Sequence, residues 1–171
     1  SIRTEQRNPE TMHIDELSTL DMVRLINRED HRVAEAVAHV CPQIAQAVDI
    51  IAAHLHGGGA IAAVGSLAAL LQVLLALAVC VSHLQQLRGK DHHIGLPGVR
   101  LVVGLIAGGY PAIFKAVEGA EDNRALGRED LAGISFCKND VLVGIAASGR
   151  TPYVLGAMAY AKELGAPVIG V

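Results

Sequence analysis

The sequence predicts an α/β domain in which helices cover both faces of a parallel β-sheet. Short apolar runs alternate with longer amphipathic stretches, and this order is typical of parallel sheets. Hydrophobic residues make up 51% of the chain, with no Trp, three Tyr and two Phe, so the expected core is aliphatic. A chain of 171 residues is long enough for one domain with its own core and too short for two of ordinary size.

The first part of the chain is expected to be helical. Ser18, followed three residues later by Asp21, has the pattern of a capping box and predicts a short helix over residues 18–30. A second helical region follows from about Asp30 and meets Pro42, which either kinks it or opens a new helix. Beyond Pro42, apolar residues at helical spacing predict one stripe, formed by Ile44, Ala47, Val48, Ile51, Ala52 and Leu55.

A glycine triplet, residues 57–59, follows this stripe and precedes an expected strand at residues 60–64. Glycine-rich phosphate loops follow a strand and open a helix, whereas this triplet closes a helix. The position favours a helix C-cap over the alternative of a phosphate loop.

The segment from Ser66 to Leu87 is apolar almost all the way round, and no Asp, Glu, Lys or Arg occurs between Asp49 and Arg88. This segment has three interpretations: a buried or subunit-interface helix, a membrane-spanning helix, or an anomalous stretch of sequence. The Ala content, the interspersed polar residues and the surrounding α/β pattern favour a buried helix, so no membrane is expected as a partner.

The remaining elements continue the alternation. We expect a buried strand at residues 99–109, a mostly helical region at 111–133 with a break at Gly119, and a strand at 140–147. A helix beginning near Pro152 and a strand at 166–171 complete the pattern.

Composition excludes several classes of function. The net charge of −3, the pI near 6.2 and the lack of a basic cluster argue against nucleic acid as a partner. The eight histidines form no recognised metal pattern. The polar N-terminal residues resemble neither a signal nor a transit peptide. The cysteines are widely spaced and favour a reduced cytoplasm: Cys41, Cys80 and Cys137.

The sharpest chemical signal is the turn Ser148-Gly149-Arg150-Thr151, between an expected strand and an expected helix. Thr151 suits an N-cap and Pro152 the first helical position, so main-chain N–H groups and two hydroxyls would gather at the positive end of the helix. Such a turn suits a phosphate, and an ordinary turn with a helix cap is the equal alternative. A serine nucleophile is disfavoured because the G-x-S-x-G pattern is missing.

A second candidate is the acidic run Glu118, Glu121 and Asp122, which follows the strand expected at residues 99–109. Acids that begin a helix usually interact with its dipole and with solvent. The alternative is that one carboxylate faces the crevice at the strand ends and acts as an acid or base.

Three stretches in this order resemble the N-acetylmuramic acid 6-phosphate etherases: "TEQRNPETMHIDELSTLDMVRLINRED", "VVGLIAGG" with "AVEGAED", and "NDVLVGIAASGRTPYVLGAMAYAKELGA". The resemblance implies a three-layer sandwich of the sugar isomerase (SIS) type, preceded by N-terminal helices and related to glucokinase regulatory protein. It implies a cytoplasmic homodimer, free of metal and cofactor, that cleaves the D-lactyl ether of a phosphorylated amino sugar. Glu121 matches the acidic active-site residue, and Ser148, Gly149, Arg150 and Thr151 match the phosphosugar loop.

The chain departs from the family in its central segment. Where the family has a hydroxyl-rich loop and a second catalytic glutamate, this chain holds residues 60–100, which contain no carboxylate before Asp91. It therefore resembles roughly the first half of the family. Residues 1–56 would form an N-terminal helical arm and the first helices of the SIS unit, and residues 57–171 a partial SIS domain. Two functions follow as hypotheses: an etherase, or a phosphosugar-binding module without catalysis.

Overall fold

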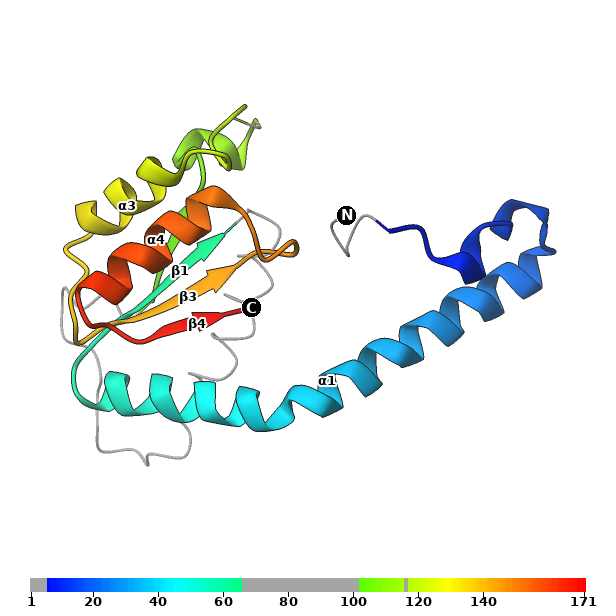
Figure 1. Ribbon diagram of the computed structural model, residues 1–171, viewed down its shortest axis with the longest axis horizontal. Coiled ribbons are helices and arrows are strands. Elements are labelled where there is room, and N and C mark those ends of the chain that lie inside the picture. Colours follow the sequence, from blue (N-terminus) through cyan, green and yellow to red (C-terminus); the bar gives the residue numbers. More distant parts are fainter. Residues whose placement is uncertain (1–5, 66–101, 116) are drawn as a thin grey trace. The chain divides into compact units, whose positions relative to one another are not determined.

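A computed structural model describes residues 6–65, 102–115 and 117–171 (Figure 1). The chain divides into two compact units, Ser1–Asp49 and Ile50–Val171. Helix α1, Thr19–His56, begins in the first unit and ends in the second. The segment Ser66 to Leu87, for which we expect a buried helix, lies outside the described residues.

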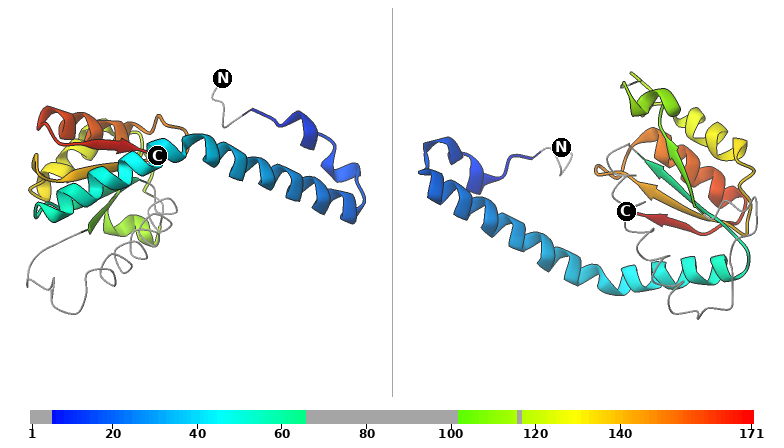
Figure 2. Two further views of the ribbon diagram at one scale, coloured as in Figure 1. Left: turned by 90° about the horizontal axis from the view of Figure 1, so that it is seen from below. Right: turned by 180° about the vertical axis from the view of Figure 1, so that it is seen from behind.

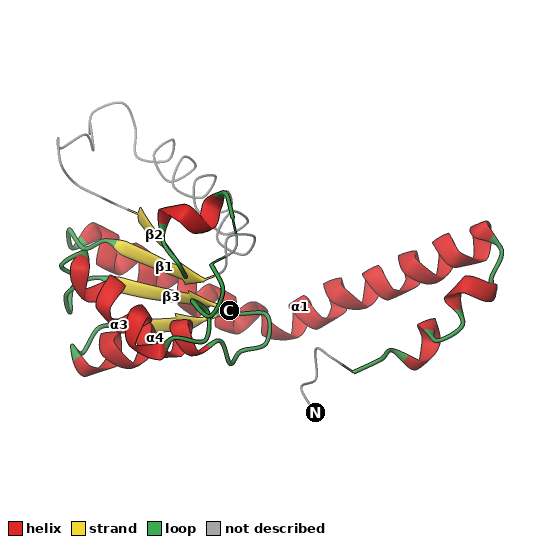
Figure 3. Ribbon diagram, turned by 90° about the horizontal axis from the view of Figure 1, so that it is seen from above, coloured by secondary structure: helices red, strands yellow, loops and turns green. Residues whose placement is uncertain are grey.

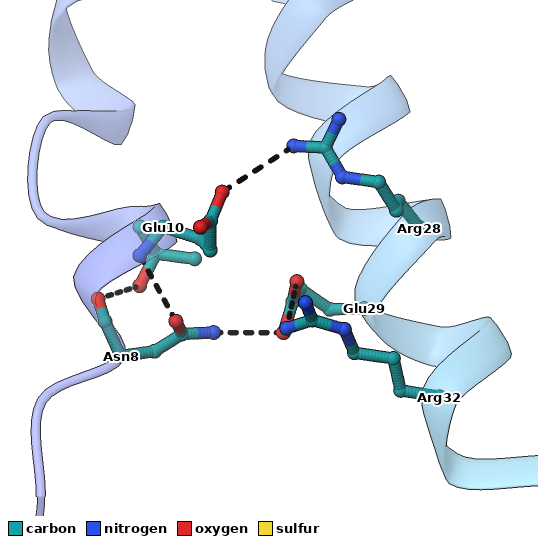
Figure 4. A network of polar contacts seen from close by, with 6 residues as sticks. Asn8, Glu10, Arg28, Glu29 and Arg32 are labelled. Carbon is teal, nitrogen blue, oxygen red and sulfur yellow. Dashed lines mark hydrogen bonds and ion pairs between the residues drawn. The ribbon is translucent and has the colours of Figure 1, made fainter. Parts of the chain in front are cut away.

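In the first unit two short 3-10 turns, η2 (Pro9–Thr11) and η3 (Ile14–Glu16), precede α1. A polar network joins η2 to the helix: Asn8 Nδ2 donates to Glu29 Oε2 at 2.8 Å, and Arg28 lies 4.0 Å from the Glu10 carboxylate (Figure 4). The one buried side chain among the described residues of this unit is Leu25. Because exposed ion pairs contribute little to the free energy of unfolding, the interactions within this unit stabilise it only weakly.

Helix α1 begins as the capping box predicts, since the Asp21 N–H donates to Ser18 Oγ at 3.2 Å. Its length differs from the prediction: a single helix of 38 residues replaces the short helix at 18–30 and the region beyond it. Pro42 lies inside this helix. Proline removes one main-chain hydrogen bond, and a helix whose surface is exposed tolerates that loss because water solvates the freed carbonyl.

The second unit contains a four-stranded parallel sheet in the order β2-β1-β3-β4 (Figure 3). Its strands are β1 (Ile61–Gly65), β2 (Val102–Ile106), β3 (Val141–Ile145) and β4 (Val168–Gly170). β2, β3 and β4 lie within the stretches where the sequence predicts strands, and β1 begins and ends one residue later than the stretch predicted at residues 60–64. Since the strands are parallel, the turns that follow them meet at one edge of the sheet.

Side chains alternate along the strands and form two cores. Ala62, Val64 and Leu142 pack against α3 (Arg124–Gly133) and α4 (Pro152–Glu163), which lie on one face of the sheet (Figure 2). Ile61, Ala63, Val143 and Ile145 point to the opposite face, where Ile51 and Leu55 from the end of α1 pack against them. The predicted sandwich with helices on both faces is therefore confirmed.

Strand β2 differs from the prediction of a buried strand. Four of its residues are half-buried and Gly104 is exposed, whereas β1 and β3 are buried throughout. The reason is its place at the edge of the sheet, where β1 is its partner among the described strands. The order of strands depends on contacts between distant residues, so the apolar run alone could not reveal it.

The glycine triplet is a helix C-cap, as predicted. The Gly57 N–H donates to the Ala53 carbonyl at 3.1 Å and the Gly59 N–H to the His54 carbonyl at 2.9 Å, while Gly58 has a φ of 85°. These bonds satisfy carbonyls at the end of α1 and turn the chain into β1.

Candidate functional site

The site is built from the turn after β3. The Gly149 N–H donates to the Ala146 carbonyl at 2.8 Å and closes the turn, and Gly149 has a φ of 64° that favours glycine. The Arg150 N–H donates to Ser148 Oγ at 3.2 Å, so the serine hydroxyl is held on the inside of the turn. Ser148, Gly149 and Arg150 are all exposed at the carboxyl edge of the sheet.

Helix α4 begins where the sequence predicts, with Thr151 at the N-cap position and Pro152 at the first helical position. The Thr151 side chain makes no capping hydrogen bond, and its carbonyl accepts from the Leu155 N–H at 3.0 Å. The alternative that Thr151 serves only as a cap therefore lacks the bond that defines a side-chain cap. Its hydroxyl is free of that role.

The first N–H group of α4 already donates a hydrogen bond within the protein. The Tyr153 N–H donates to the Glu121 carbonyl at 2.9 Å, which brings the segment carrying Glu121 directly to the start of α4. The next N–H, from Val154, has no hydrogen-bond partner among the described residues. The start of the helix thus offers one fewer main-chain donor to an anion than the sequence pattern predicts.

Glu121 belongs to a loop rather than to a helix. Helix α3 begins at Arg124, and its cap is Asn123, whose Oδ1 accepts from the Leu126 N–H at 3.1 Å. The first turn of α3 contains no acid. These acids therefore precede the helix and do not begin it, whereas their exposure agrees with the interpretation that they face solvent.

The rest of this region is less helical than predicted. Residues Tyr110–Ile113 form a 3-10 turn, η4, and the buried Ala120 anchors the loop beyond it to the core. Gly119, where the sequence predicts a break, has a φ of 73°. Glu118, Glu121 and Asp122 are exposed. A loop anchored in this way presents its carboxylates at the carboxyl edge of the sheet.

Arg150 supplies the positive charge of the site. It is exposed, and no carboxylate of the described residues forms an ion pair with it. An unpaired guanidinium next to two hydroxyls and a helix N-terminus suits a phosphate group. The Glu121 loop lies beside the start of α4 through the bond from the Tyr153 N–H, so it brings carboxylates, which suit acid–base chemistry, close to this turn.

Tyr153 and Asp130 support the site, and sequence reasoning missed them. Tyr153 is completely buried, and its hydroxyl donates to Asp130 Oδ2 at 2.7 Å. Burial raises the pKa of Tyr153 far above its ordinary value, and the hydrogen bond and the charge of Asp130 raise it further. The two residues lie on different helices, so no local pattern in the sequence connects them.

A hollow of about 460 Å³ lies elsewhere, between β2, η4 and α3. Its lining includes Tyr110, Ile113 and Ile134 and contains none of the predicted site residues. Within the described ranges, no group of three His, Cys, Asp or Glu side chains could hold a metal ion.

Comparisons with known proteins agree on one family. A model described as the glucokinase regulatory protein N-terminal SIS domain matches residues 74–162. The chain is 48% identical, over its whole length, to an N-acetylmuramic acid 6-phosphate etherase of Aeromonas hydrophila, and 50% identical, over 96% of its length, to one of Aliivibrio salmonicida. It spans about half the length of these curated relatives, 54% and 51% respectively.

The fold has a solved relative as well. A phosphoheptose isomerase from Francisella tularensis superimposes with a TM-score of 0.58 over 90% of this chain and 75% of its own, at 21% identity. At this identity the likeness concerns the fold alone, and it agrees with the parallel sheet and its flanking helices. Together with the sequence relatives, it leads to one conclusion: the chain belongs to the N-acetylmuramic acid 6-phosphate etherase family of SIS-fold proteins.

Proposed function

We propose that this chain is the phosphosugar-binding unit of a cytoplasmic, homodimeric N-acetylmuramic acid 6-phosphate etherase. The observation that carries the proposal is the hydrogen bond of 2.9 Å between the Tyr153 N–H and the Glu121 carbonyl. It holds the segment that carries a carboxylate against the segment that suits a phosphate. We assign residues 57–171 to a partial SIS domain, and residues 1–56 to an N-terminal arm together with the first helical part of the SIS unit.

In this proposal the loop of residues 148–151 binds the 6-phosphate. The Ser148 hydroxyl accepts the Arg150 N–H and keeps its own hydrogen for a phosphate oxygen. The Arg150 guanidinium neutralises the phosphate charge. A Cβ on Gly149 would point into open space, with no atom within 4 Å, so the glycine leaves that space to the phosphate. The Thr151 hydroxyl, which forms no cap, is the remaining side-chain donor.

Glu121 acts as the base in the same proposal. In the open-chain sugar the C2 proton is acidic because it lies next to the C1 aldehyde, and the lactyl ether is at C3. The carboxylate takes that proton, the C2–C3 double bond forms, and the C3–O bond breaks, while the departing oxygen takes a proton from water and leaves as D-lactate. Water then adds across the double bond, with its hydroxyl on C3 and a proton returned to C2 from the Glu121 carboxyl, which gives N-acetylglucosamine 6-phosphate. Binding energy from the remote phosphate positions the reacting carbons.

A second candidate is a phosphosugar-binding protein without etherase activity. The observation that favours it is the lack of any Asp or Glu between Asp49 and Asp91, where the resemblance implies a second catalytic glutamate. Loss of one general acid or base typically lowers a rate by about 10²–10⁴-fold. Such a chain would keep the anion loop and bind the product as well as the substrate.

Three measurements on the purified chain test these proposals. Calorimetry measures binding of N-acetylglucosamine 6-phosphate, NMR in D₂O follows exchange of its C2 proton, and an enzymatic assay detects D-lactate. We expect Ser148→Ala with Arg150→Ala to weaken binding by about 10–100-fold, since charge-assisted hydrogen bonds are lost. We expect Glu121→Gln to keep the affinity and to lower proton exchange and lactate release by about 10²–10⁴-fold.

Matched controls come from the same surfaces. Asp122→Asn and Glu118→Gln change neighbouring acids of the loop, and Lys138→Ala removes an exposed cation that precedes β3, at the other edge of the sheet. If Asp122→Asn abolishes exchange and Glu121→Gln does not, Glu121 is not the base. Binding without exchange or lactate release would establish the second candidate. Unchanged binding in the double variant would refute the phosphate loop.

A further inference from the structure

One residue of α4, Tyr153, lies between the two halves of the proposed site. Just before it in the chain, Thr151 ends the turn that suits a phosphate. The N–H of Tyr153 donates to the carbonyl of Glu121, the candidate base, at 2.9 Å. The anion-binding turn and the base are therefore joined through the main chain of a single residue, and a shift of the first turn of α4 changes the separation between them.

The side chain of Tyr153 fastens this first turn to α3, which lies beside α4 on the same face of the sheet (Figure 2). It is completely buried, and its hydroxyl donates to Asp130 Oδ2 at 2.7 Å. The other side-chain hydrogen bond between these helices among the described residues, Arg128 to Glu163, is exposed and lies at the far end of α4. Near the site, the Tyr153–Asp130 bond is therefore the polar link between α3 and α4.

The main chain of Glu121 is attached to the start of α3. Ala120, the residue before it, is buried in the core, and the Asn123 N–H donates to the Ala120 carbonyl at 3.3 Å. The side chain of Asn123 in turn caps α3. Glu121 thus keeps its place relative to α3, while the turn of residues 148–151 keeps its place relative to α4. The separation between base and phosphate site depends on how firmly the two helices are joined.

The proposed substrate presents the same two features at a fixed spacing. Its phosphate is on C6 and its acidic proton on C2, so the carbon chain between them sets their separation. One carbon more or fewer changes this separation by about 1 Å, and a misplacement of that size can lower a rate by about 100-fold. A site that holds its base and its phosphate-binding turn rigidly apart therefore selects sugars by length.

We propose that Tyr153 and Asp130 are positioning residues that make this site select six-carbon phosphosugars, by fixing the separation between Glu121 and the turn of residues 148–151. Tyr153 is completely buried, and Asp130 lines a hollow that contains none of the predicted site residues, so both act through the groups that they hold. This inference rests on the proposed function, because it needs both the phosphate site and the base.

Proton exchange at C2, followed by NMR in D₂O, tests the proposal with three 2-acetamido aldoses of five, six and seven carbons, each with its phosphate on the last carbon. The carboxylate takes the C2 proton, solvent replaces it, and a deuteron returns to C2. We expect the wild-type chain to prefer the six-carbon sugar by about 100-fold in kcat/KM. Tyr153→Phe and Asp130→Ala each remove the bond and widen the range of separations.

For these two variants we expect kcat on the six-carbon sugar to fall at least about tenfold, with KM within about threefold. The preference for six carbons should fall about tenfold, because the other lengths lose less. The double variant should resemble either single variant, since both changes remove one interaction. The preference is a ratio of rates on one sample, so partial unfolding, which lowers all three rates equally, leaves it unchanged.

Three further variants serve as matched controls. Asp130→Asn keeps an oxygen acceptor for the phenol and should retain most of the preference. Glu129→Ala changes the exposed acid next to Asp130, and Tyr160→Phe changes a partly exposed tyrosine of α4. Both should leave the preference at the wild-type value.

The outcomes distinguish this inference from the proposed function. Exchange by the wild-type chain, with the same preference in Tyr153→Phe and Asp130→Ala, refutes the selection by length and leaves the phosphate site and the base in place. A wild-type chain that neither binds nor exchanges any of the three sugars refutes the proposed function and the selection with it. If the chain binds the sugars without exchange, calorimetric affinities replace the rates, and equal preferences in wild type and Tyr153→Phe refute the selection.

Discussion

Tyr153 joins three segments of the second unit through three different groups. Its N–H holds the Glu121 carbonyl, its hydroxyl holds Asp130, and its carbonyl lies where a Cβ on Gly127 would clash with it. A residue with this many roles cannot shift without moving the start of α4. The position of the candidate phosphate loop therefore depends on a buried phenol that touches no ligand.

The raised pKa of Tyr153 predicts a pH dependence of stability. The folded state keeps the phenol protonated above the ordinary tyrosine pKa of about 10, where the unfolded chain loses the proton. The stabilisation is therefore complete below about pH 10 and falls above it, by up to about 1.4 kcal/mol per pH unit. Tyr153→Phe should be less stable at pH 8 by about 1 kcal/mol, from the lost hydrogen bond, but should lose less stability between pH 10 and 11.

Urea unfolding followed by circular dichroism at pH 8, 10 and 11 measures this difference, since the chain has no Trp for fluorescence. Tyr160→Phe, a change at a partly exposed tyrosine on the same helix, is the control. Parallel curves for wild type and Tyr153→Phe above pH 10 would contradict the assignment.

At the scale of elements, helices α3 and α4 approach each other through glycine. A Cβ on Gly127 would clash with the Tyr153 carbonyl, and one on Gly156 would clash with the Arg124 carbonyl. The two glycines come from opposite helices, so each backbone fits against the other. This close contact sets the position of α4 on the sheet, and with it the turn at residues 148–151.

Gly127→Ala tests this contact. Because the added methyl group meets backbone that cannot move aside, we expect a loss of about 1–3 kcal/mol in the free energy of unfolding. Gly133→Ala, in the same helix, meets nothing within 4 Å and should stabilise by up to about 1 kcal/mol through helix propensity. Urea denaturation of both variants measures the difference, and equal effects would mean that the close approach is unimportant.

The elements also show where sequence reasoning succeeds. The strand β3, its turn and α4 were predictable because every signal is local: an apolar run, a glycine, and Thr151-Pro152 at a helix start. The continuity of α1 through Pro42 was not predictable, because proline usually breaks a helix. The helix tolerates Pro42 because its surface is exposed there. The exposure of β2 depends on the strand order, which no local pattern contains.

For the candidate site, the residue types were predictable and their arrangement was not. The family resemblance implies Glu121 and residues 148–151 as site residues. The bond that joins their segments is between main-chain groups of Glu121 and Tyr153, and such groups leave no trace in residue identity. The role of Asp130 could not be predicted either, since its hydrogen-bond partner, Tyr153, lies on another helix.

At the scale of the whole molecule, the two compact units differ in how they are stabilised. The second unit has two apolar cores, whereas Leu25 is the one buried side chain described in the first. Stability should therefore be uneven along the chain.

Hydrogen exchange measures this unevenness. We expect amides of β1 and β3 to exchange most slowly in every variant, because both strands are buried throughout. Amides of residues 30–46 should exchange at least about tenfold faster than those of the two strands, because every residue in this part of α1 is exposed. Equal protection of residues 30–46 and of the two strands would contradict this uneven distribution of stability.

The central place of β1 in the sheet has a consequence for synthesis of the protein. Both neighbours of β1 come later in the chain, and its link to Asp140, the bond from the Ala60 N–H to Asp140 Oδ1, joins residues 80 positions apart. At about 5–20 residues per second, the ribosome needs roughly 4–16 s to make that stretch. During this time β1, which is buried throughout in the finished fold, lacks its partner strand β3. Its apolar residues must be kept from aggregating until β3 has been made.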